Sequence, residues 1–158
     1  MSLDGHEAGG WALTINGFST MELANPYATP QERIAHTLGR LDGKKLYALS
    51  ISAYPRGLTF DKVNPKKGLQ EYLQCAGSRD QLTLEVRAKD ALGDFSQYVI
   101  GRRPPSGGHS DVRIVWDAHS TMVLPSEVFD ADSALAVFDA YLAGRSVPAN
   151  YALRRISA

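Results

Sequence analysis

Residues 81–88, QLTLEVRA, decide the fold, because their strict alternation is typical of a strand buried on one face only. Leu82, Leu84 and Val86 are the apolar residues, and polar residues stand between them. Residues 69–77, LQEYLQCAG, indicate a shorter strand, and AGSRD at 76–80 has the composition of a hairpin turn. Two strands joined by a tight turn predict an antiparallel pair.

Further strands are expected on both sides of this hairpin. The segments are KLYALSISAY at 45–54, DFSQYVIGRR at 94–103, VRIVWD at 112–117, TMVLP at 121–125 and VPANYALRRIS at 147–157. The four residues 117–120, DAHS, are predicted to close a second hairpin. Residues 55–68 contain prolines, glycines and basic residues, and they indicate a long irregular excursion.

Two helices are expected. The first begins with Thr29 as N-cap, Glu32 completes a capping box, and Gly43 is the predicted stop. Residues 130–144, DADSALAVFDAYLAG, form the second, with Asp130 as the cap and Gly144 as the stop. Each helix has an apolar stripe at helical spacing.

The element order predicts an α+β fold, with a mostly antiparallel sheet of five to seven strands and two helices packed on one face. Residues 1–10 are expected to be a flexible tail, and residues 11–158 a single domain. Trp116 is expected in a central strand and in the same buried cluster as Phe138 of the second helix. These two aromatic residues test the predicted packing.

Composition narrows the class of protein. The chain has 158 residues, 44% of them hydrophobic and 22% charged, and no apolar run has the length of a membrane-spanning helix. The start of the chain has no secretory signal pattern, and Cys75 is the single cysteine, so no internal disulfide is possible. We expect a cytoplasmic protein without membrane attachment.

The polar residues Asp117, His119 and Ser120 contain the side-chain types of a hydrolase triad. No G-x-S-x-G motif accompanies them, and Asp and Ser belong in turns because their side chains bond nearby backbone groups. We interpret the segment as a turn and expect no enzyme activity. The four histidines show no metal-ligand spacing, so no metal or cofactor is predicted; they are His6, His36, His109 and His119.

Charge is distributed unevenly along the chain. Residues 33–103 contain 13 Lys and Arg against 7 Asp and Glu, whereas residues 104–139 contain 6 acidic residues and only Arg113 as a base. The basic excursion from Arg56 to Lys67 has only Phe60 as a stacking aromatic, and the pI is about 6.9, so direct binding of nucleic acid is not expected. The acidic segment is a candidate for binding a basic partner.

The C-terminal half resembles the Imm1 family of immunity proteins from bacterial polymorphic-toxin systems. The resemblance lies in QLTLEVR, FSQYVIGR and VRIVWD, followed by MVLPSEVFDADSALAVFDAYLAGRSVPANYALR, and it covers about the last 80 residues. It implies a cytosolic α+β protein that binds a cognate toxin domain encoded by a neighbouring gene, in many cases a deaminase or nuclease, and blocks its active site. The acidic residues available for such binding are Asp111, Asp117, Glu127 and Asp132.

Two other classes stay open on the sequence. A small hydrolase or ligand-binding domain would use a pocket between the sheet and the helices. A secretion chaperone would more often be acidic and dimeric.

Overall fold

The computed structural model describes residues 10–54, 71–105 and 107–157. These residues contain helices α2 (Pro30–Arg40) and α4 (Ala131–Gly144), and the short 3-10 helix η2 (Pro125–Glu127). The strands are β1 (Trp11–Ile15), β2 (Ser19–Glu22), β3 (Ala48–Ala53), β4 (Tyr72–Ser78), β5 (Gln81–Lys89), β6 (Phe95–Arg102), β7 (Val112–Trp116), β8 (His119–Val123) and β9 (Tyr151–Ser157). The α+β class is confirmed.

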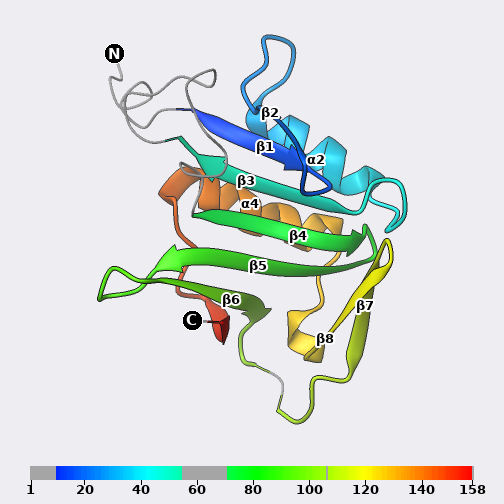
Figure 1. Cartoon of the computed structure of the whole chain (residues 1–158), viewed down its shortest axis with the longest axis vertical. Coiled ribbons are helices and arrows are strands. Elements are labelled where there is room, and N and C mark those ends of the chain that lie inside the picture. The colour runs from blue at the N-terminus through cyan, green and yellow to red at the C-terminus, as the bar shows by residue number, and fades with distance from the viewer. Residues whose placement is uncertain (1–9, 55–70, 106, 158) are drawn as a thin grey trace.

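Seven strands form one sheet in the order β2-β1-β3-β4-β5-β6-β9, and each neighbouring pair is antiparallel. Strands β7 and β8 form a separate two-stranded sheet, which stands beside the ends of β4 and β5 at the lower right of Figure 1. The prediction that VRIVWD is a central strand of the main sheet was therefore wrong. The hairpin that it forms lies outside that sheet.

The β1–β2 hairpin was not predicted from the sequence. Its turn contains Asn16 in the left-handed region, at φ 54°, a conformation that asparagine adopts more readily than most residues. The Asn16 Oδ1 accepts hydrogen bonds from the backbone N–H groups of Tyr47 and Ala48, so the turn also fixes the start of β3. Gly10, the last residue of the predicted tail, accepts a hydrogen bond from the Tyr54 N–H and is part of the fold. Residues 1–9 and the excursion predicted at 55–68 lie outside the described residues.

Helix α2 begins as predicted. The Thr29 hydroxyl accepts from the Glu32 N–H, and the Glu32 carboxylate accepts from the Thr29 N–H, which completes the capping box. The helix ends at Arg40 with Leu41 as its C-cap, earlier than the predicted stop at Gly43. Leu41 returns the chain toward the core, where it is buried.

Helix α4 also begins as predicted, with Asp130 accepting from the Ser133 N–H. Gly144 is the last helical residue, and Arg145 takes the left-handed cap conformation at φ 57° that the prediction gave to the glycine. The predicted and observed C-terminal ends of α4 therefore differ by one residue.

The core lies between the sheet and the two helices, which cover the same face of the sheet (Figure 1). On the sheet side, the core is formed by every second residue of the strands, such as Leu82, Leu84 and Val86 of β5. On the helix side, it is formed by Ile34, Leu38, Val137 and Phe138. This confirms that two helices pack on one face. Within the described ranges, no helix combines the length and the apolar composition needed to cross a membrane.

Candidate functional site

The β7–β8 hairpin is closed by a turn of two residues, Asp117 and Ala118, because Trp116 pairs with His119. Asp117 has a positive φ of 52°, and its backbone N–H donates to the Gly43 carbonyl at 2.6 Å. The predicted hairpin is confirmed, but the predicted four-residue connection was too long. The bond to Gly43 fastens the tip of the hairpin to the loop after α2.

One face of the hairpin packs on the main sheet. Ile114 and Val123 are buried against Val99 of β6, with Trp116 partly buried beside them. Phe138 lies in the larger cluster between the sheet and the helices. The prediction that Trp116 and Phe138 share a cluster was wrong, since the hairpin packs on the face of β6 that the helices leave open.

The other face of the hairpin points into solvent. Val115 is 52% exposed and Met122 is 44% exposed. Val115 is paired with Ser120, and Met122 with Arg113, and both polar partners are also exposed. We call these four residues the outer face of the hairpin: Arg113, Val115, Ser120 and Met122.

The geometry of the hairpin separates the three residues of the hydrolase interpretation. His119 and Ser120 are consecutive residues of β8, so their side chains project from opposite faces of the strand. The His119 ring lies near Trp116, at 6.2 Å between centroids, on the side away from Ser120. In the described residues, no hydrogen bond connects Asp117, His119 and Ser120, so they are not assembled as a nucleophile, a base and an orienting acid.

Three of the four predicted toxin-binding carboxylates are exposed, but they do not form one cluster. Asp111 precedes β7 and Asp117 follows it, so about six residues of extended chain, roughly 20 Å, separate them. Asp132 lies in the first turn of α4. Of the other histidines, His36 is exposed on α2 and His109 is exposed in the loop before β7.

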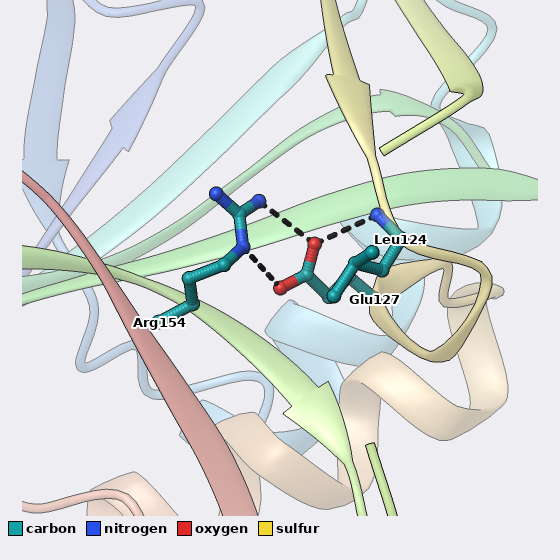
Figure 2. Close-up of polar contacts among 3 residues, drawn as sticks. All are labelled: Leu124, Glu127 and Arg154. Atoms are coloured by element: carbon teal, nitrogen blue, oxygen red, sulfur yellow. Dashed lines mark hydrogen bonds and ion pairs between the residues drawn. The ribbon is translucent and has the colours of Figure 1, made fainter. Parts of the chain in front are cut away.

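Glu127 differs from the other three, because it is only 3% exposed. Its two carboxylate oxygens accept from Nε and Nη2 of Arg154, both at 2.8 Å, and Oε1 also accepts from the Leu124 N–H at 2.8 Å (Figure 2). Hydrogen bonding to Glu127 raises the pKa of Arg154 above its ordinary value. The pair joins η2 to the edge strand β9.

Arg154 belongs to a polar row on the face of the sheet that the helices leave open. The register places Gln74 opposite Glu85, Glu85 opposite Val99, and Val99 opposite Arg154. Glu85 Oε1 accepts from the side-chain amides of Gln74, at 3.1 Å, and Gln97, at 2.5 Å. Glu85 therefore joins Gln74 and Gln97 in one hydrogen-bonded group, and the partly buried Arg154 lies on the same face beyond Val99.

The sequence indicates the position of Glu85 in this row but not that of Arg154. The alternation in residues 81–88 places Glu85 opposite the buried leucines, so its face was predictable. Arg154 was not identified, because nothing local indicates that β9 pairs with β6 across an intervening hairpin and helix.

Two further kinds of site were considered in the described part of the chain, a reactive thiol and a metal site. Burial raises the pKa of the Cys75 thiol to about 12, which leaves almost no thiolate at neutral pH. No group of three or more His, Cys, Asp or Glu side chains in these residues has the arrangement of a metal site. Comparisons of the chain with protein families, with curated proteins and with solved structures found no match.

Proposed function

We propose that the protein is an immunity protein that binds and neutralises a cognate bacterial toxin by blocking its active site, as the Imm1-like sequence implies. The residues that carry the resemblance fold into β5, β6, the β7–β8 hairpin, η2, α4 and β9. The proposed partner is a toxin domain of the deaminase or nuclease class encoded by a neighbouring gene, and the proposed site of action is the cytoplasm.

The observation that carries the proposal is the outer face of the hairpin. Val115 and Met122 present exposed apolar surface next to Arg113, and Met and Arg are enriched in protein interfaces. The opposite face of the hairpin is held by the buried Ile114 and Val123, so the outer face is preformed. A preformed surface loses less conformational entropy on binding.

The exposed carboxylates support the same proposal through electrostatics. Asp111 and Asp117 lie at the two ends of β7 and therefore bracket the outer face. A toxin that acts on nucleic acid presents a basic groove, and carboxylates beside the docking surface accelerate encounter with it. Glu127 has no comparable role in the proposal, because Arg154 already engages its carboxylate in the interior.

The proposal is tested by co-expression with the toxin domain of the neighbouring gene. We expect protection of the producing cell and a one-to-one complex in size-exclusion chromatography with light scattering. Val115→Glu combined with Met122→Glu should raise Kd by at least about tenfold, because it places charge in the centre of the apolar contact.

The matched control is Phe18→Glu combined with Leu92→Glu, because it adds the same two charges at exposed apolar positions elsewhere. Phe18 is 78% exposed in the turn between β1 and β2, and Leu92 is 87% exposed in the turn between β5 and β6. It should leave Kd unchanged. Failure to form a complex or to protect the cell would refute the immunity function. Equal loss of affinity in the hairpin variant and in the Phe18/Leu92 control would refute the assignment of the binding face.

A further inference from the structure

A pocket opens between the β1–β2 end of the sheet and helix α2. Its volume is about 390 Å³. The residues around it are Leu13, Ile15, Met21, Arg33, Thr37, Arg40, Lys45 and Leu46. Figure 1 shows α2 behind β1 and β2, so the pocket lies at the edge of the layer that elsewhere contains the core.

The pocket exists because α2 presents two different stripes to the sheet. Ile34 and Leu38 are buried in the core. Arg33, Thr37 and Arg40 follow the helical spacing i, i+4 and i+7, so they form a neighbouring polar stripe that faces the pocket. A long polar stripe at this position leaves Ile15, Met21 and Leu46 only partly buried.

Positive charge surrounds this apolar floor. Arg33 is held in place, because its Nη1 donates to the carbonyls of Glu22 and Leu23, both at 2.7 Å. Arg40 and Lys45 are exposed at the rim. The pocket lining contains no carboxylate, and within the described ranges none of these three cations forms an ion pair.

We infer that this pocket binds a small amphipathic carboxylate, with its apolar body on Ile15, Met21 and Leu46 and its anionic head toward Arg40 and Lys45. The lining supplies both requirements, since apolar contact gives affinity and cations without a carboxylate partner select the anion; among the described residues, Arg40 Nη1 contacts only the neutral or cationic ring of His36, at 3.5 Å. The Thr37 hydroxyl donates to the Arg33 carbonyl, so the basic side chains are the head-group donors. The site is separate from the hairpin surface of the proposed function.

The test uses octanoate as the probe, with 1-octanol as a probe of the same length without charge. Titration of the ¹⁵N-labelled full chain should shift the backbone amide signals of residues 13–15, 21, 33–40 and 45–46. Octanoate should bind roughly tenfold more tightly than 1-octanol, because hydrogen bonds between two charged groups are stronger than hydrogen bonds to a neutral hydroxyl.

Arg40→Gln combined with Lys45→Gln should abolish the preference for octanoate and retain the fold, because both side chains are exposed. The control combines Lys44→Gln with Arg113→Gln, which changes the net charge equally outside the pocket lining, and it should retain the preference. Equal affinity for octanoate and octanol, shifts confined to other regions, or an unchanged preference in the Arg40/Lys45 variant would each overturn the inference.

Discussion

Glu127 illustrates how a residue's environment decides its role. In the sequence it is one of several carboxylates in an acidic segment, and the sequence does not distinguish which of them lie on a binding surface. In the fold, η2 places it over Gly101 of β6, where an added Cβ would approach the Glu127 side chain to 3.1 Å. The close approach permits the bidentate contact with Arg154, 27 residues later in the chain. The negative charge of Glu127 is therefore balanced by Arg154 inside the protein.

Removing the Glu127 carboxylate should therefore reduce stability. Glu127→Ala should lower the free energy of unfolding by about 2–3 kcal/mol, since it leaves the Leu124 N–H without an acceptor and Arg154 without a counter-ion. The Arg154 side chain is 39% exposed, so solvent screening keeps the loss below that of a fully buried pair. Urea unfolding measures it.

Asp132→Ala provides the comparison, because this exposed carboxylate in the first turn of α4 should contribute about 0.5 kcal/mol. A double-mutant cycle with Arg154→Met isolates the pair itself. If Glu127→Ala and Asp132→Ala lost the same small amount, the buried position of Glu127 would be contradicted.

At the scale of elements, the two helix starts were predictable and their ends less so. Thr29 with Glu32, and Asp130 with Ser133, are local patterns in which side chains satisfy the first free N–H groups. The ends depend on where the chain must turn toward the core, which is set by tertiary contacts. Leu41 is buried, and this burial ends α2 before the glycine does.

The caps predict a pH dependence of stability. Backbone hydrogen bonding lowers the pKa of Glu32 through Thr29, and that of Asp130 through Ser133. A lowered folded-state pKa stabilises the fold above the ordinary carboxyl pKa, and this stabilisation is lost as the pH falls through the folded value. We expect the Tm of the wild type to fall more between about pH 5 and pH 3 than that of a Glu32→Gln, Asp130→Asn variant.

Circular dichroism melting curves at a series of pH values measure this difference. The two proteins should differ most near neutral pH and converge in acid, where both cap carboxylates of the wild type are protonated. Parallel dependence of Tm on pH in the two proteins would count against a contribution from the caps.

At the scale of the whole molecule, the sheet separates two hydrophobic clusters. The larger lies under α2 and α4 and contains Phe138, which has no exposed surface. The smaller lies between the hairpin and the opposite face of β6, and Trp116 only borders it. The two aromatic residues should therefore respond differently to truncation.

Phe138→Ala should cost about 3–5 kcal/mol, because it leaves a large cavity in the main core. Trp116→Ala should cost less, despite the larger side chain, since part of the ring is already in contact with solvent. Thermal and urea unfolding of both variants measure the difference. A Tm of the Phe138 variant within a degree or two of the wild type would contradict its placement in the core.

The parts of the fold that were predicted from sequence are those encoded locally. Alternation gave β5, helical spacing gave α4, and turn composition gave the β7–β8 hairpin. The β1–β2 hairpin was missed because its turn signal, Asn16 and Gly17, is short and lies in residues 11–28, to which no element was assigned from the sequence. Strand order was not predictable. The position of Trp116 and the partner of Glu127 depend on strand order, so they were not predictable either. Both depend on contacts between distant segments.

The position of β9 at the edge of the sheet also has a consequence for the order of folding. Its neighbour β6 is complete at Arg102, but β9 begins only at Tyr151, after the hairpin and α4 have been synthesised. A nascent chain that has exposed residues up to 150 contains Glu127 without its counter-ion and β6 with an unpaired edge. The pairing of β9 with β6 and the ion pair between Arg154 and Glu127 therefore both require residues 151–157 to have been synthesised.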